Sequence, residues 1–155
     1  VKTPYIFMGY LKNPEETAKA LKDGWYYTGD IGKFDEDHCL YIMGRSKEMI
    51  ISGGYNIYAE EVEQVLAACP KVQEVAVIAV PDEKWGEAVK AVCILKPGVQ
   101  ACEEEIFDFC KDKMAGYKKP RSVDFVESLP RAGADKIARN KLREKYWAGQ
   151  KRRVS

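Results

Sequence analysis

Two short motifs in the first third of the chain carry side chains that could bind a nucleotide. Asp30 ends the run Tyr27-Thr28-Gly29-Asp30, and its carboxylate could accept hydrogen bonds from both hydroxyls of a ribose, as acidic residues do in dinucleotide sites. Arg45 follows fifteen residues later and could present its planar guanidinium to phosphate or ribose oxygens. Both also have plain structural alternatives, since Asp30 could bond to local amides in a turn and Arg45 could form a surface ion pair.

Two later segments could contact a ligand in other ways. The pair Gly53-Gly54 would let the backbone approach a ligand closely, or would simply close a hairpin. Lys136 lies three residues after Gly133, and a lysine on such a loop could reach a phosphate or carboxylate as a compact point charge. The alternative for Lys136 is an ordinary solvated lysine in a basic stretch that opens a helix.

Apolar spacing and turn residues predict the elements that position these side chains. Residues 59–69 have apolar residues at helical spacing and acidic residues in their first turn, which favours a helix. Residues 74–80 and 88–95 predict two strands separated by a loop. The remaining predicted elements are a β-hairpin of 25–34 with 39–44, strands at 49–52 and 123–128, and helices at 14–21, 103–114 and 137–147.

This order predicts an α+β fold after Lys47, with a small mixed sheet flanked by helices. Residues 1–46, which hold the β-hairpin segment, are too few to bury their own core, so we expect them to be the C-terminal edge of a larger domain. A small domain at 47–150 and a solvated tail at 151–155 would follow. The first residue, Val1, is not an initiator methionine, and we expect the chain to be part of a longer one.

Composition and charge exclude several classes of function. The chain has 155 residues, 46% hydrophobic and 32% charged, as in ordinary globular proteins. Its 25 basic and 24 acidic residues give a formal net charge of +1, so nucleic-acid binding is disfavoured, and the basic run at 116–121 is short. No apolar run approaches the roughly 20 residues that cross a bilayer. The five cysteines form no Cys-x-x-Cys pair and the single histidine is His38, so we expect no metal site and no disulfide framework.

Together, these motifs resemble those of the adenylate-forming superfamily, which includes acyl- and aryl-CoA synthetases, luciferases and the adenylation domains of peptide synthetases. The pattern YxTGD, then GRxxxxIxxGGxNIxxxEVE, then LPRxxxxKIxRxxLR is present in this order and spacing, within a similarity that runs from about Gly9 to Tyr146. Residues 49–63, MIISGGYNIYAEEVE, are especially similar to the CoA-forming branch. Each motif is weak by itself, whereas their joint occurrence is specific.

The resemblance implies an AMP-forming acid:CoA ligase. Such an enzyme activates a carboxylic acid with ATP to an acyl-adenylate and pyrophosphate, and then transfers the acyl group to CoA. Asp30 matches the carboxylate that holds the ribose hydroxyls, and Arg45 matches the arginine beside the nucleotide at the domain junction. Lys136 matches the catalytic lysine that bridges the acid carboxylate and the ATP phosphate oxygens, where an aimed ammonium stabilises developing charge.

The resemblance also assigns residues to the second half-reaction. Residues 47–150 would be the mobile C-terminal lid domain, with Lys47 at the hinge whose torsions swing the lid between half-reactions. Ser52, Gly53 and Gly54 match the loop that lines the channel for the pantetheine arm of CoA.

Three further residues match contacts with the CoA nucleotide. Trp85 matches an aromatic residue that stacks on the CoA adenine in some aryl-CoA ligases, and Tyr117 and Lys119 match a nearby aromatic and basic pair. The alternative for Trp85 and Tyr117 is partial burial in the small core. The family usually has glycine before its catalytic lysine, whereas this chain has Asp135, whose carboxylate could repel ATP.

The implied partners complete the expectation. The acid pocket, the phosphate-binding loop and most of the Mg²⁺ ligation would lie in the large N-terminal domain of the same polypeptide, so the chain alone is expected to be inactive. The expected substrates are ATP, CoA and a fatty or aromatic carboxylic acid, and the expected location is the cytoplasm, with no transmembrane segment. A stand-alone nucleotide- or CoA-binding module, or an accessory module that docks on a separate large domain, is the alternative.

Overall fold

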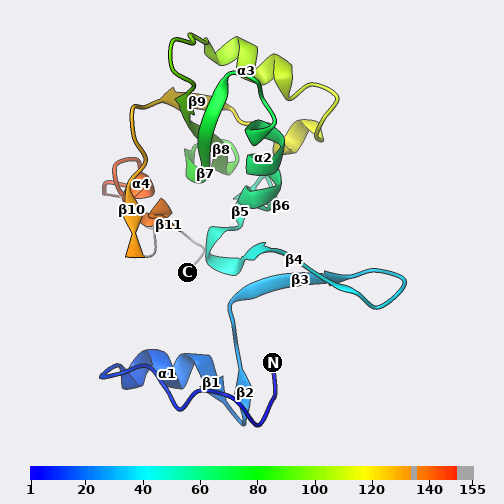
Figure 1. The fold of residues 1–155 in the computed structure, drawn as a ribbon, viewed down its shortest axis with the longest axis vertical. Coiled ribbons are helices and arrows are strands. Elements are labelled where there is room, and N and C mark those ends of the chain that lie inside the picture. The colour runs from blue at the N-terminus through cyan, green and yellow to red at the C-terminus, as the bar shows by residue number, and fades with distance from the viewer. Residues whose placement is uncertain (134–135, 150–155) are drawn as a thin grey trace. The chain divides into compact units, whose positions relative to one another are not determined.

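The computed structural model describes residues 1–133 and 136–149, and the chain divides into two compact units (Figure 1). The first unit is Val1–Ile42 and the second is Met43–Ser155. Asp135 and the expected tail at 151–155 lie outside the described residues. The expected division of the chain into 1–46 and 47–150 stays a prediction.

The first unit contains one helix and short strands joined by tight turns. Its elements are α1 (Pro14–Ala20), β1 (Leu21–Lys22), β2 (Trp25–Tyr26), β3 (Asp30–Phe34) and the first residues of β4 (Leu40–Arg45). Helix α1 begins where Asn13 Oδ1 accepts a hydrogen bond from the Glu16 amide at 3.2 Å, as an N-cap side chain does. Strand β3 pairs with β4, which confirms a hairpin in this region.

The predicted hairpin strand at 25–34 is wrong in its first half. Strand β2 pairs with β1 instead, across a turn at Asp23 and Gly24. Both turn residues have positive φ, at 52° and 75°, as a type I′ hairpin turn requires. Gly29, at φ 76°, then separates β2 from β3.

The first unit has no hydrophobic core. No residue of Val1–Ile42, all of which the structure describes, is buried. Tyr5 is 92% exposed, Met8 99% and Leu11 91%. Apolar surface of this extent is typical of a surface that another protein surface covers.

The second unit is a mixed sheet with helices on both faces. Its elements are the end of β4, η1 (Ser46–Glu48), β5 (Ile50–Ser52), β6 (Tyr55–Ile57), α2 (Ala59–Ala67), β7 (Val72–Asp82), β8 (Gly86–Leu95), α3 (Glu103–Phe109), η2 (Gly116–Lys118), β9 (Ser122–Phe125), β10 (Arg131–Ala132), β11 (Lys136–Ile137) and α4 (Arg139–Glu144). The main sheet has the order β6-β5-β8-β7, and β9 pairs in parallel with β8 while the other pairs are antiparallel. The α+β prediction with a small mixed sheet is confirmed. In residues 1–133 and 136–149, no helix has the length and apolar character that spanning a membrane requires.

Two cores lie on opposite faces of β7 and β8. The first contains Val75, Val77 and Ala79 with residues of α2 and α3, and the second contains Ala76 and Ile78 with residues around α4. Figure 1 shows α2 and α3 on one side of the sheet and α4 with β10 and β11 on the other. Because both faces are covered, residues 75–80 of β7 and 91–95 of β8 are continuous apolar runs, and the charged Glu87 and Lys90 of β8 are themselves buried.

Strand β7 forms one edge of this sheet, and side chains from other elements bind its outer backbone groups. Glu63 Oε1 accepts a hydrogen bond from the Val77 amide at 2.7 Å. Trp147 Nε1 donates one to the Ala79 carbonyl at 2.9 Å. Covering an edge in this way prevents pairing with other chains, and here it also attaches α2 and the segment after α4 to the same strand.

Two predicted helices are shorter in the structure, and one strand was not predicted. Helix α3 ends at Phe109 instead of residue 114, and Asp112, at φ 62°, has left the helical region. The predicted helix at 137–147 is shortened to α4, because Ile137 pairs with Arg131 in β11. Strand β6, which follows the Gly53-Gly54 turn, was not predicted.

Candidate functional site

The Gly53-Gly54 pair forms the turn of the β5–β6 hairpin. Gly53 has φ 58° and Gly54 φ 87°, a left-handed conformation that glycine adopts without steric cost. Ser52 pairs with Tyr55 in the hairpin and with Gly86 of β8, which fixes the turn beside the start of β8. Ser52 is only 7% exposed, so its side chain is turned away from solvent.

Gly53 lies directly against the ring of Trp85. An ideal Cβ built on Gly53 would be 2.4 Å from Trp85 Cε3, closer than any real Cβ contact. The Gly53 amide also donates a hydrogen bond to the Trp85 carbonyl at 3.0 Å. The Trp85 amide in turn donates to Asp82 Oδ1 at 2.8 Å. The absence of a side chain at position 53 is therefore what allows the turn and the indole to meet.

Two cations lie over the indole of Trp85. Lys84 Nζ is 4.9 Å from a ring centroid, and Arg121 Cζ is 5.1 Å from it. Cations near an aromatic face are favourable in themselves. Together they make an environment that suits a ligand with both an aromatic ring and phosphate groups.

Tyr117 stacks on Tyr55, the residue that follows the turn. The ring centroids are 4.5 Å apart and the planes are inclined by 23°. Both rings are exposed, Tyr55 at 55% and Tyr117 at 44%. Lys118 holds this segment to α2 through an ion pair with Glu61, with Nζ and Oε1 2.5 Å apart.

These contacts gather three distant segments into one surface. We call it the turn face, and its residues are Gly53, Gly54, Tyr55, Trp85, Tyr117 and Arg121. Four of the six were predicted. Tyr55 and Arg121 were missed, although an aromatic residue directly after Gly-Gly and an arginine directly after Lys-Lys-Pro were visible signals. Lys119 is half-buried and lies two residues from Tyr117.

Lys136 lies on a separate two-stranded ribbon made by β10 and β11. It is exposed and stands opposite Ala132 of β10. Arg131 ties the ribbon to β7 through an ion pair with Glu74, with Nη2 and Oε2 2.7 Å apart. Ile137, next to Lys136, packs against the second core. The lysine is thus presented to solvent from an anchored element.

The other predicted nucleotide and hinge residues lie earlier in the chain. Asp30 begins β3 in the first unit, and its amide donates to Thr28 Oγ1 at 3.0 Å, a local turn contact. Arg45 ends β4 and is exposed. Lys47 lies in η1, and its carbonyl accepts a hydrogen bond from Arg143 Nη1 at 3.2 Å.

A charged network joins η1, α2 and α4. Arg139 binds Glu63 through Nε–Oε1 at 3.1 Å and Nη2–Oε2 at 2.7 Å, and it binds Glu48 through Nη1–Oε2 at 3.1 Å. Burial opposes the charge of Arg139, but the bonds to Glu63 outweigh it and raise the pKa of Arg139. Burial raises the pKa of Glu60, and the nearby carboxylate of Glu48 adds to this.

A second polar cluster holds the end of α4 on the sheet. Lys90, which is 9% exposed, forms an ion pair with Asp124, with Nζ and Oδ1 2.6 Å apart. The hydroxyl of Tyr146 donates to Asp124 Oδ2. Burial alone would raise the pKa of Asp124, but the bonds from Lys90 and Tyr146 lower it. In the part of the chain that the structure describes, no three or more His, Cys, Asp or Glu side chains are grouped to hold a metal ion.

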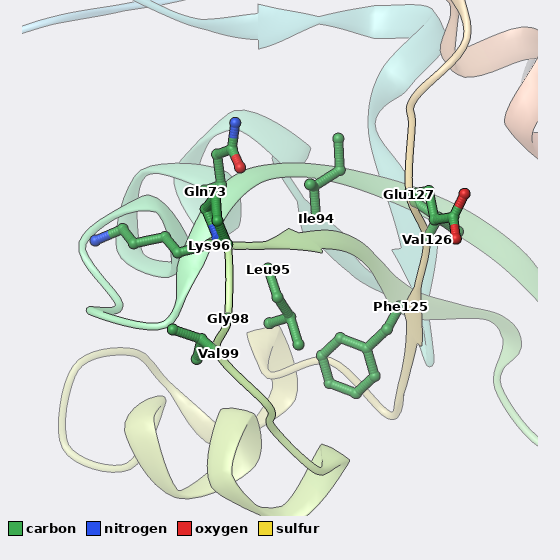
Figure 2. Close-up of a pocket in the computed structure, with 10 residues that line it drawn as sticks. Gln73, Ile94, Leu95, Lys96, Gly98, Val99, Phe125, Val126 and Glu127 are labelled. Atoms are coloured by element: carbon green, nitrogen blue, oxygen red, sulfur yellow. The ribbon is translucent and has the colours of Figure 1, made fainter.

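An open groove lies away from the predicted residues. Its volume is about 640 Å³, and it is lined by Gln73, residues 94–99 and residues 125–127 (Figure 2). None of the predicted site residues lines it.

Comparison with known proteins decides the family. Residues 61–136 match the family described as the AMP-binding enzyme C-terminal domain. A 3-[(3aS,4S,7aS)-7a-methyl-1,5-dioxo-octahydro-1H-inden-4-yl]propanoyl:CoA ligase of Rhodococcus jostii is 48% identical over 145 residues, which are 93% of this chain and 28% of that relative. A long-chain-fatty-acid–CoA ligase of Bacillus subtilis is 46% identical over 144 residues, which are 93% of this chain and 26% of that relative. The chain belongs to the adenylate-forming superfamily.

Solved structures match the chain along most of its length. ATP-bound MatB from Rhodopseudomonas palustris is 40% identical with a TM-score of 0.83, over 94% of this chain and 29% of MatB. Apo MatB from the same organism is also 40% identical over 94% of this chain and 29% of MatB, but its TM-score is 0.68. Since the protein is the same, MatB itself has a different shape in its two structures over the matched region. The chain spans less than a third of the length of these relatives and corresponds to their C-terminal part.

Proposed function

We propose that the chain is the C-terminal part of an AMP-forming acid:CoA ligase, which converts ATP, a carboxylic acid and CoA into acyl-CoA, AMP and pyrophosphate. One observation carries the proposal: a single unit holds both an exposed lysine on an anchored ribbon and a separate turn face of glycines, aromatic rings and cations. The 48% identity to a CoA ligase supports the same activity.

Lys136 serves the adenylation step in this proposal. Its ammonium lies between the acid carboxylate and the α-phosphate of ATP, where it stabilises the charge that develops on the phosphate oxygens. It also holds the two reactants together, which lowers the entropic part of the barrier. The ion pair of Arg131 with Glu74 and the packing of Ile137 support this role, because they fix the ribbon and leave the lysine side chain to move.

The turn face serves thioester formation. Gly54 opens onto free space, with nothing within 4 Å of an ideal Cβ, so the backbone there can line a narrow channel for the pantetheine arm. Trp85 and Tyr117 offer aromatic faces to the adenine of CoA. Arg121 and Lys119 supply positive charge for its phosphates. Because Ser52 is buried, it contributes through its backbone.

Residues 1–46 complete a large N-terminal domain in this proposal. The absence of any buried residue in Val1–Ile42 and the exposure of Tyr5, Met8 and Leu11 support this, since a covering domain would bury them. Asp30 then holds the ribose hydroxyls of the nucleotide, and Arg45 lies beside it at the domain junction.

Lys47 is the proposed hinge, and residues 47–150 are the proposed lid. Two shapes of MatB over the matched region support a change of arrangement in the superfamily. Swinging the lid would move Lys136 away after adenylation and bring the turn face to the acyl-adenylate.

The remaining assignments concern what the large domain supplies. ATP is used with Mg²⁺, and because the described residues form no carboxylate cluster fit for a metal, the large domain is the proposed source of its ligands. The acid is fatty or aromatic, and the large domain selects it. The proposed location is the cytoplasm.

Ligase assays of two proteins test the proposal. The 155-residue chain alone should release no AMP with any acid, whereas a protein that joins it to its large domain should catalyse acid-dependent pyrophosphate exchange and form acyl-CoA with some member of a panel of fatty and aromatic acids. Acid-dependent AMP release by the chain alone would contradict the assigned division of labour. Tight CoA binding by the chain alone, with no ligase activity in the longer protein, would instead support a stand-alone module.

A further inference from the structure

We propose that Arg143 and Arg139 fasten the peptide after Lys47 to helix α4, so that the lid swings at Lys47 or before it and not at Glu48 or beyond. The inference rests on the proposed function, which supplies the swing. It assigns both arginines as positioning residues that set where the moving body begins.

The contacts that carry the inference join segments about a hundred residues apart. Arg143 Nη1 donates to the Lys47 carbonyl at 3.2 Å, across a separation of 96 residues. Arg139 Nη1 lies 3.1 Å from Glu48 Oε2, while its other nitrogens bind Glu63 of α2. The Lys47 carbonyl and the Glu48 side chain are thus both bound to helix α4, and both lie on the C-terminal side of the Lys47 torsions.

Covalent geometry determines which rotations these contacts allow. The Lys47 carbonyl lies beyond both the φ and the ψ bond of Lys47, and the planar peptide bond joins it rigidly to Glu48. Rotation at Lys47 therefore moves the carbonyl, Glu48 and α4 as one body, and it leaves both arginine contacts intact. It breaks the hydrogen bond from the Met49 amide to the Arg45 carbonyl, 3.1 Å long, which spans the pivot. Rotation at Glu48 or Met49 would instead pull the chain away from Arg143.

Helix α4 is a firm anchor because several contacts hold it. Leu142 is buried in the second core. Just beyond the helix, Tyr146 binds Asp124 of β9, and Trp147 binds the Ala79 carbonyl of β7. The ribbon that carries Lys136 enters α4 directly. The helix therefore couples the hinge peptide to the adenylation lysine.

Amide hydrogen exchange of the 155-residue chain tests the anchor without any ligase activity. In a Lys47→Pro background, which restrains the pivot, Arg143→Ala should speed exchange of the Met49 amide roughly fivefold. Its hydrogen bond to Arg45 can then open through the Glu48 torsions, which the Arg143 hydrogen bond, of ordinary net strength, otherwise holds. Lys141→Ala removes the same charge from an exposed position of the same helix and should leave this amide unchanged. Equal exchange in the Lys47→Pro chain with and without Arg143→Ala would overturn the anchor.

Suppression in the full-length ligase tests the confinement of the swing. Lys47→Pro should slow transfer to CoA, because proline fixes φ at the pivot. Adding Arg143→Ala and Glu48→Gln should restore part of that rate, since the torsions of Glu48 and Met49 then become available. A structural role alone would lower the rate further, so the absence of any restoration would overturn the confinement. If the full-length protein has no ligase activity, the proposed function is wrong. If Lys47→Pro transfers acyl groups to CoA at the parental rate, the proposed hinge is wrong. In either case the exchange measurement still decides whether Arg143 is the anchor.

Discussion

Replacing Gly53 by alanine perturbs the contact around which the turn face is built. The added Cβ would lie 2.4 Å from Trp85 Cε3 and 2.9 Å from Cζ3. Carbon atoms in favourable contact are about 3.5–4.0 Å apart, so the indole must move by about 1 Å or more. The Trp85 amide is bonded to Asp82 at 2.8 Å and the ring lies 5.1 Å from Arg121, so this movement disturbs contacts on both sides of the ring.

Gly53→Ala should lower the free energy of unfolding for two reasons, and a control variant can separate them. The left-handed backbone, at φ 58°, costs an alanine about 1–2 kcal/mol. Forcing the ring aside adds about 1–3 kcal/mol, the usual range for overpacking. Gly54→Ala is the matched control, because Gly54 has φ 87° but nothing within 4 Å of its ideal Cβ. It should lose only the backbone part, about 1–2 kcal/mol.

Chemical denaturation of the chain, followed by far-UV circular dichroism, measures both variants. In a Trp85→Ala background the difference between Gly53→Ala and Gly54→Ala should disappear, because the obstructing ring is gone. In the full-length ligase, Gly53→Ala should raise the KM for CoA and leave pyrophosphate exchange unchanged. Equal destabilisation by the two alanines in the parental background would refute the packing of Gly53 on Trp85.

Three further predictions concern Lys136, the half-buried carboxyl of Glu60 and the cysteine thiols. Lys136→Ala in the full-length ligase should slow adenylation by orders of magnitude and leave acyl transfer from supplied acyl-adenylate to CoA intact. Acylation of the Lys136 side chain, which removes its charge, should have the same effect. Single-turnover kinetics of each half-reaction measures the effect of the mutation and of the modification. Burial raises the pKa of Glu60 above its ordinary value of 4.5, so its charge lowers stability once the pH rises through the raised pKa. Glu60→Gln should therefore raise the Tm at neutral pH, with the gain vanishing below about pH 4. Thiol labelling of the folded chain should modify Cys39 and Cys102, which are exposed, and spare the three buried cysteines, among which burial raises the pKa of Cys93 to about 12.

Local features of the turn and strands could be predicted because they depend on neighbouring residues. Two consecutive glycines between apolar runs indicated a tight turn, and φ values of 58° and 87° at Gly53 and Gly54 show why glycine is needed there. The burial of Ser52 could also have been inferred. It lies two residues after the buried Ile50 in a strand, so the two side chains share a face.

Contacts between distant segments could not be predicted in this way. The approach of Gly53 to Trp85 depends on the pairing of Ser52 with Gly86, and nothing in the local sequence specifies that register. The same holds for Arg143 and Lys47, which are separated by 96 residues. The mistaken helix start at residue 137 has another cause, since pairing with Arg131, only six residues earlier, overrides local helical preference there.

The attachment points of the ribbon and the turn face explain why a ligase built on this unit would need a swing. Arg131 ties the ribbon to Glu74, which pairs with Ile94 near one end of the β7–β8 ladder. The turn face joins the ladder at its other end, where Gly86 pairs with Asp82. Eight residues of strand separate the two points, which is about 26 Å at 3.3 Å per residue. If the proposed lid is rigid and places Lys136 at an acyl-adenylate, its proposed CoA-binding surface is attached far from that point. Rotation about a pivot outside both attachments would then exchange the two. The Lys47 torsions are outside both, because the chain enters the proposed lid there and the peptide after Lys47 is bound to α4.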